Sequence, residues 1–131
     1  MSFDWSEYLT LAQELTSRSV NSPIQEAHLR AAISRAYYAA FCKARNYLSD
    51  KDGYSTPSGT NVHWDVVDKF ETSSDMKRRK VGALLRSLRG IRNIVDYQEA
   101  FYGNKLGRTQ GALTEAKQII SLLRTYRSLK L

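Results

Sequence analysis

The sequence contains few of the residues from which disulfides and metal centres are built. Its 131 residues include one cysteine, Cys42, and two histidines, His28 and His63. A single cysteine excludes an internal disulfide, and a structural zinc site needs more cysteine or histidine ligands than this chain supplies. We therefore expect no metal and no cofactor.

Long apolar runs are also missing. No run approaches the roughly 18 apolar residues that a membrane-crossing helix needs. The N-terminal sequence MSFDWSEYLT has neither the basic region nor the apolar region of a secretory signal. With 42% hydrophobic and 25% charged residues, the composition is that of an ordinary soluble globular protein. We expect one domain over residues 1–131, located in the cytoplasm and away from membranes.

The alternation of apolar and polar residues that marks a strand is absent, whereas apolar residues recur at helical spacing in five segments. Turn residues in SDKDGYSTPSGT, 49–60, predict a mobile loop between the second and third segments. The predicted fold is all-α, an antiparallel bundle of four to five helices. The expected helices run from a cap at Asp4 to about Arg18, from a cap at Ser22 to about Leu48, over 61–70, from a cap at Ser73 or Ser74 through 81–95, and after 102–107 to the C-terminus.

Apolar stripes on the last three helices identify the expected core. On the third helix the inward positions are Val62, Val66, Val67 and Phe70. On the fourth they are Val81, Leu84, Leu85, Leu88, Ile91 and Val95. On the fifth they are Leu113, Ala116, Ile119, Ile120, Leu123, Tyr126 and Leu129.

Charge is distributed unevenly along the chain. Residues 1–75 hold 7 Lys/Arg and 10 Asp/Glu, a net charge of −3, whereas residues 76–131 hold 13 and 3, a net charge of +10. A basic surface of this kind suits a polyanion, because each phosphate contact releases counterions and adds affinity. A solvated helix face, or one docked on an acidic partner, would have the same composition.

Polar residues interrupt the alanine-rich second helix and the end of the fourth. Ser34, Tyr37 and Tyr38 stand at spacings that put them on one side of their helix. In LRGIRNIVDY, 88–97, Arg92 and Asp96 form an i, i+4 pair, and Arg89 lies one turn before Arg92. One interpretation is a buried structural network that ties two helices together; the other is a functional site.

Three segments in order, AISRAYYAAF, VHWDVVDKF and LRGIRNIVDY, resemble a branch of the HEPN family, small helical domains of prokaryotic toxin-antitoxin and defence operons. The branch has a Ser-Arg-x-Tyr-Tyr-Ala motif, a histidine that opens the next helix with an aromatic residue further on, and an Arg-x3-Asp-Tyr motif. The matching residues here are Ser34, Arg35, Tyr37, Tyr38 and Ala39, then His63 and Phe70, then Arg92, Asp96 and Tyr97.

The resemblance implies a bundle of four or five helices that often forms a homodimer with its active surfaces facing each other. Many HEPN proteins are metal-independent endoribonucleases, in which an arginine holds the phosphate and a histidine a few positions later does acid-base chemistry. Arg92 and Asn93 match the start of that motif, but Tyr97, Gln98 and Glu99 stand where the histidine would fall. Tyrosine, with an ordinary pKa near 10, is a poor general base at neutral pH.

Two functional hypotheses follow from these residues. In the first, the protein is a binding or regulatory module that uses Arg89, Arg92 and the basic last helix to engage RNA or a nucleotide, or that pairs with a nucleotidyltransferase-type antitoxin. In the second, it is an endoribonuclease toxin in which Arg92 binds the scissile phosphate and His63 is the base or acid. Ser34, Tyr38 and Asp96 would then orient these two, with Tyr37, Asn93 and Tyr97 shaping the site.

Overall fold

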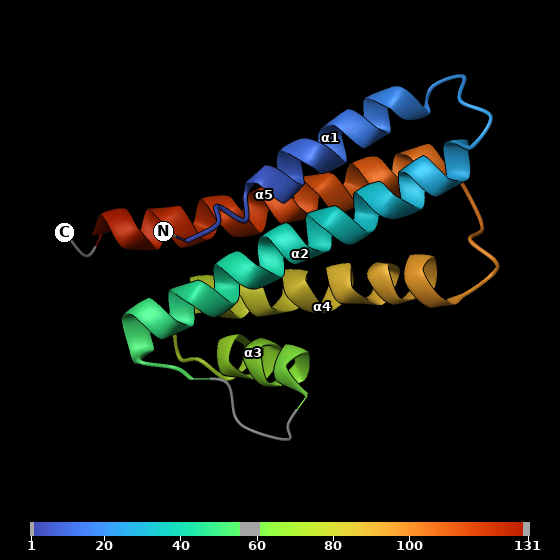
Figure 1. Ribbon diagram of the computed structural model, residues 1–131. Helices are drawn as coiled ribbons and strands as arrows, with labels where there is room; N and C mark the ends of the chain where they lie inside the picture. Colours follow the sequence, from blue (N-terminus) through green and yellow to red (C-terminus); the bar gives the residue numbers. More distant parts are fainter. Residues whose placement is uncertain (1, 56–60, 130–131) are drawn as a thin grey trace.

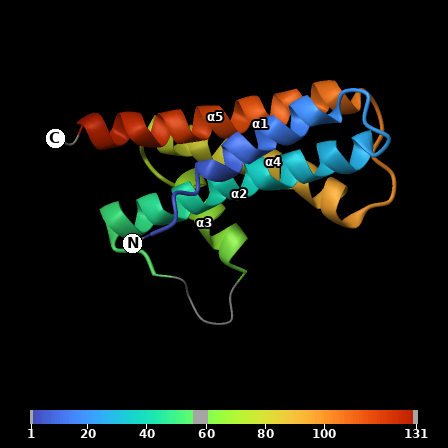
Figure 2. The same cartoon turned by 45° about the horizontal axis from the view of Figure 1, so that its top comes forward.

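The computed structural model describes residues 2–55 and 61–129, with side chains up to Arg124. Within these ranges the chain forms five helices and no strand. They are α1 (Glu7–Ser19), α2 (Gln25–Asp52), α3 (Val62–Glu71), α4 (Met76–Tyr97) and α5 (Lys105–Leu129). The four long helices run antiparallel in chain order, and the short α3 lies beside α4 (Figures 1 and 2). The predicted all-α bundle is confirmed.

Helix α2 is the centre of the bundle, and it contacts each of the other helices. The alanines at positions 32, 36, 39, 40 and 44 are all 0% exposed. Small side chains allow neighbouring backbones to approach closely on more than one side. The alanine-rich run therefore allows the other helices to pack closely on α2. Its polar side chains Ser34 and Tyr37 make hydrogen bonds to the helices that pack there.

The starts of three helices differ from the predicted ones. Asp4 accepts hydrogen bonds from the backbone and hydroxyl of Ser6, so it forms a turn ahead of α1. Ser22 Oγ accepts a hydrogen bond from the Ile24 backbone N–H at 3.2 Å, and α2 begins three residues later than this serine. At α4 the cap is Asp75, whose carboxylate accepts hydrogen bonds from the backbone N–H groups of Lys77 and Arg78. Ser73 Oγ accepts the Asp75 N–H. Local side-chain bonds by the serines compete with capping.

Helix α2 also continues past its predicted end at Leu48 to Asp52. It stops at Gly53, which has φ +67° and donates its N–H to Leu48 O, the left-handed cap that glycine adopts without strain. Residues 49–52 are therefore helical and do not belong to the predicted 49–60 loop. Residues 56–60 of that loop, with the Pro57-Ser58-Gly59 turn, lie outside the described residues.

The core follows the predicted stripes closely. Of the inward positions on α3, α4 and α5, Val62, Leu84 and Ile91 are half-buried, and every other one up to Leu123 is buried. The side chains of Tyr126 and Leu129 lie outside the described part of the chain. None of the described helices is long and apolar enough to cross a membrane.

Two contacts fix α3 and the end of α4. A Cβ at Gly82 would lie 2.7 Å from Glu71 Cγ and 2.8 Å from Glu71 N, so the end of α3 packs directly on the α4 backbone. At the other end of α4, Arg30 of α2 donates to the backbone oxygens of Val95, Gln98 and Glu99 at 2.7–2.9 Å. The Val95 carbonyl belongs to the last turn of α4 and has no partner inside the helix, while Gln98 and Glu99 lie just past its end. Arg30 thus holds the segment that carries Arg92 and Asp96.

Candidate nucleic-acid interface

Helices α2 and α3 bring a tyrosine and a histidine together. Asn61 caps α3 by accepting the backbone N–H groups of His63 and Trp64, which sets the position of both side chains. Tyr37 Oη then lies 2.6 Å from His63 Nδ1. Because Tyr37 is 0% exposed, burial raises the pKa of its hydroxyl and keeps the proton on oxygen. Oη and Nδ1 therefore share one hydrogen bond, in which either the hydroxyl or the Nδ1–H donates, according to the tautomer of neutral His63.

The His63 imidazole is neutral at physiological pH. Its ring stacks on Phe41 with centroids 4.3 Å apart. Burial, together with the positive charges of Arg92, Arg89 and Arg45, lowers the pKa of His63 to about 4. An imidazole in this state carries no charge at neutral pH, and its Nδ1 is engaged with Tyr37 Oη.

We expect the stability of the protein to fall as pH is lowered from about 6.5 to about 4. The unfolded chain binds a proton at His63 near pH 6.5, whereas the folded chain does so near pH 4, so acid favours unfolding across this window. NMR titration of His63 in a His28→Gln variant measures the folded pKa directly. A midpoint near 6.5 in the folded protein would contradict the buried, neutral imidazole.

Helices α2 and α4 meet at Ser34, Asp96 and Arg92. Ser34 Oγ donates to Asp96 Oδ2 at 3.1 Å, and the same carboxylate oxygen is 3.7 Å from Arg92 Nη1. Arg92 is 4% exposed and its guanidinium lies over the ring of Tyr37, with Cζ 4.8 Å from the centroid. A long bond of 3.4 Å joins Nη1 to Tyr97 Oη. Arg92 Nε is buried without a hydrogen-bond partner in the described part of the chain.

Three arginines one turn apart on α4, Arg86, Arg89 and Arg92, form what we call the arginine row. Arg86 and Arg89 lie over the Trp64 indole, with Cζ 4.7 and 4.4 Å from the ring centroid. Arg86 is neutralised by two hydrogen bonds to the Glu71 carboxylate at 2.7 Å. Arg89 has no carboxylate partner among the described residues, and its Nε is also buried and unpartnered. The row therefore contains two cations whose hydrogen-bonding capacity is incompletely used.

The structure brings most of the predicted site residues into one cluster. Its members are Ser34, Tyr37, Tyr38, His63, Arg89, Arg92, Asp96 and Tyr97. Asn93 is half-buried and makes no hydrogen bond to another described residue. Arg35, part of the family-like motif, lies over Tyr8 of α1, with Cζ 5.1 Å from the ring. No group of three or more His, Cys, Asp or Glu side chains suited to a metal occurs in the described ranges.

Sequence reasoning missed the parts that Trp64, Arg86 and Phe41 have in this cluster. Trp64 is 44% exposed and is off the inward stripe of α3. The sequence did contain a signal. Trp64 is a large aromatic residue on the outward side of an amphipathic helix, and the next helix has arginines at i, i+3 and i+6. The stacking of Phe41 under His63 depends on how α2 and α3 meet, which no local pattern contains.

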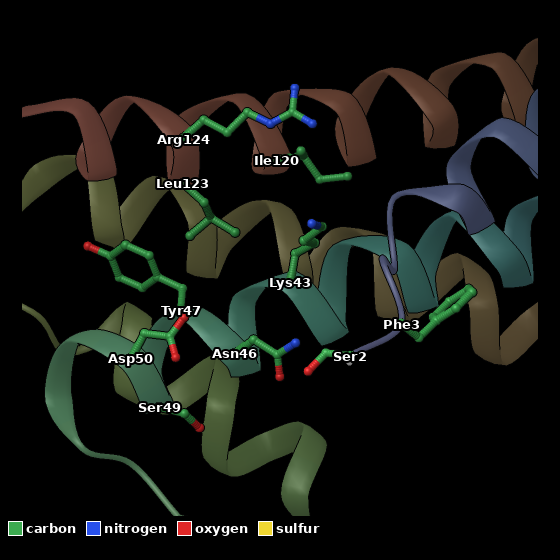
Figure 3. Close-up of a pocket in the computed structure, with 10 residues that line it drawn as sticks. All are labelled: Ser2, Phe3, Lys43, Asn46, Tyr47, Ser49, Asp50, Ile120, Leu123 and Arg124. Carbon is green, nitrogen blue, oxygen red and sulfur yellow. The ribbon is translucent and has the colours of Figure 1, made fainter.

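A separate cavity of about 410 Å³ lies between the C-terminal half of α2, α5 and the N-terminal segment (Figure 3). Lys43 and Arg124 are the two cations that line it, and Lys43 is paired with Asp4 at 2.9 Å. Asp4 is held ionised, because hydrogen bonds from Ser6 and Lys43 lower the pKa of its carboxyl. None of the predicted site residues lines this cavity. It is therefore distinct from the arginine row.

No family model, curated protein or solved structure matches this chain.

Proposed function

We propose that the protein binds RNA through the arginine row and Trp64. The observation that supports this best is the pair of buried, unpartnered Nε–H groups on Arg89 and Arg92. Buried polar groups in proteins almost always have a partner, and beyond the Asp96 carboxylate, 3.7 Å from Arg92 Nη1, no described carboxylate pairs with either arginine. Arginine donates two parallel hydrogen bonds to phosphate, so a phosphate group is the ligand that these two side chains suit.

Access to the row is uneven. Arg89 is half-buried beside the exposed Trp64, whereas Arg92 is covered in part by Tyr97. Tyr97 is 76% exposed and its bond to Arg92 is long, so a phosphate oxygen can replace its hydroxyl at little cost. Phosphate first meets Arg89 and then reaches Arg92.

The surrounding aromatic residues favour nucleic acid over a free anion. Trp64 exposes part of its indole next to the cations, and Tyr97 stands out from the end of α4. Aromatic side chains beside a basic surface stack with unpaired bases, the usual arrangement in proteins that bind single strands. The net charge of +10 over residues 76–131 adds long-range attraction for a polyanion.

The biological setting that we propose rests on the three family-like motifs alone. By their resemblance to HEPN proteins, the chain is the RNA- or nucleotide-binding component of a prokaryotic toxin-antitoxin or defence system, with a nucleotidyltransferase-type partner.

Binding is favoured over RNA cleavage by the state of His63. A base with a pKa of about 4 takes up a proton only weakly at neutral pH, and Nδ1 is already engaged in a hydrogen bond with Tyr37 Oη. A general acid needs the protonated ring, and a pKa of about 4 leaves very little of that form at neutral pH. His63 therefore suits a hydrogen-bonding residue of fixed position better than it suits a proton carrier.

We expect the affinity for a short fluorescent single-stranded RNA to fall steeply with salt. Each phosphate neutralised on a single strand contributes a slope of about −0.7 in log K against log salt, so Arg89 and Arg92 together give about −1.4 or steeper. Anisotropy titrations at several salt concentrations measure this slope. Affinity should survive His63→Ala, and the RNA should stay intact without metal. Absence of binding at low salt would rule out the proposal, and cleavage lost in both His63→Ala and Arg92→Ala would establish the ribonuclease instead.

A further inference from the structure

A second surface lies on the opposite side of α4 from the arginine row. It is a groove of about 620 Å³ between α4 and α5, on residues spaced three or four apart on each helix. Helix α4 contributes Ser87, Gly90, Ile91 and Ile94, and α5 contributes Arg108, Gly111, Ala112 and Glu115. At 100° per residue, the α4 positions in the groove are roughly opposite Arg89, Arg92 and Asp96 on the helix.

The two glycines in the groove have no role within the chain. A Cβ at Gly90 or at Gly111 would meet nothing within 4 Å, and neither residue has the positive φ that only glycine tolerates well. Glycine disfavours helix relative to alanine. Gly90 and Gly111 leave the floor of the groove open beside the half-buried Ile91 and Ile94. A helix of another molecule can pack closely on a floor of this kind.

The charges at the two ends of the groove are unpaired and opposite. Arg108 uses Nη1 to donate to Tyr102 O at 2.8 Å, and Glu115 uses Oε1 to accept from Ser87 Oγ at 3.3 Å. No ion pair joins either one to a described residue of its own chain. They are seven residues apart, about 10 Å along α5, which is too far for them to pair with each other.

We infer that this groove is where two copies of the chain pack face to face. Their twofold axis crosses α5 between Gly111 and Ala112, and α4 between Gly90 and Ile91. Antiparallel pairing about that point sets Arg108 opposite the second copy's Glu115, and Glu115 opposite its Arg108. On α4 the same axis sets each Ile91 against the open floor at Gly90. One rotation therefore pairs both charges and fills the gap at Gly90 in each copy, as an isologous interface requires.

The inference is independent of RNA binding, because the arginine row faces away from the groove. It also differs from the dimer that the HEPN resemblance implies, in which the active surfaces face each other. The ion pairs set the register of the two copies, while the isoleucines packed on glycine contribute most of the affinity.

Reciprocal charge exchange tests the pairing by sedimentation velocity. The wild-type chain of 14.9 kDa should sediment at twice that mass. Arg108→Glu alone and Glu115→Arg alone each place like charges opposite each other and should be monomeric. An equimolar mixture of these two variants restores both ion pairs, so it should form a heterodimer, and the variant with both changes should form a homodimer. Recovery on mixing shows that each single variant is folded.

A steric pair of variants tests the groove itself. Gly111→Leu should leave the melting temperature of the monomer unchanged or raised, yet should abolish the dimer. Gln110→Leu, exposed on the other flank of α5, should leave the dimer intact. A wild-type chain that stays monomeric across the concentration series, a dimer that survives Arg108→Glu, or a mixture that fails to associate would overturn the inference.

Discussion

Replacing Arg89 and Arg92 together with alanine is expected to weaken RNA binding about 100-fold at moderate salt. A hydrogen bond to a charged group contributes roughly 1.5–3 kcal/mol, and each 1.4 kcal/mol is a tenfold change in the dissociation constant. Losing one such contact at each of the two arginines costs about 3 kcal/mol or more, which corresponds to at least a 100-fold weaker affinity. The slope of log K against log salt should become shallower by about 1.4 at the same time.

Controls separate the effect on binding from charge and folding. Lys117→Ala removes an exposed cation from α5, away from the row, and should change affinity by less than about threefold, since it loses only long-range attraction. Because Arg92 is buried, Arg89→Ala alone and Arg92→Lys provide variants with less effect on the α2–α4 contact. If Lys117→Ala weakens binding as much as the double variant, RNA binds to general positive charge and not to the row.

Arg30→Ala is expected to lower the free energy of unfolding by about 1.5–3 kcal/mol, because it removes three hydrogen bonds donated by a charged group, one of them part-buried and two exposed. The side chain is 19% exposed and donates to Val95, Gln98 and Glu99 O, besides pairing with Glu26. Its loss leaves the last carbonyls of α4 to water and loosens the segment that carries Asp96. Urea denaturation followed by circular dichroism measures the change.

Glu26→Gln is the matched control for Arg30. It removes the ion pair with Arg30 at 2.9 Å and the longer one with Lys105 at 3.7 Å, and it leaves the three bonds from Arg30 to the end of α4 in place. Exposed ion pairs contribute about 0–1 kcal/mol, so this variant should stay within 1 kcal/mol of the wild type. Equal losses in the two variants would show that Arg30 acts through Glu26 and not as a cap on α4.

The helices could be predicted from sequence because their buried faces repeat at the helical period. Val66, Phe70, Leu85 and Ile119 are inward for that reason, and the structure confirms them. The helix starts were harder to predict, because Ser22 has alternative hydrogen bonds to nearby N–H groups that propensity alone does not rank. Gly53, which ends α2, is a recognisable stop signal in the sequence. The four polar residues before it, 49–52, are compatible with a helix, so the predicted end at Leu48 was too early.

The candidate site was only partly predictable for a similar reason. Arg92 and Asp96 share one helix face, so their proximity follows from spacing. The Tyr37–His63 bond and the three bonds of Arg30 join residues that lie 26 to 69 positions apart. They depend on how α2 packs against α3 and α4, which the periodicity of each helix does not contain.

The central claim is that the guanidinium groups of Arg89 and Arg92 bind phosphate of RNA. The most direct measurement is ¹H–¹⁵N NMR of arginine Nε–H and tryptophan indole N–H resonances during titration with single-stranded RNA. The account predicts that the Arg89 and Arg92 Nε–H and the Trp64 indole resonances shift together at the lowest RNA additions, ahead of any signal from α5. Shifts confined to the α5 arginines, with Arg89 and Arg92 unchanged at saturation, would contradict it.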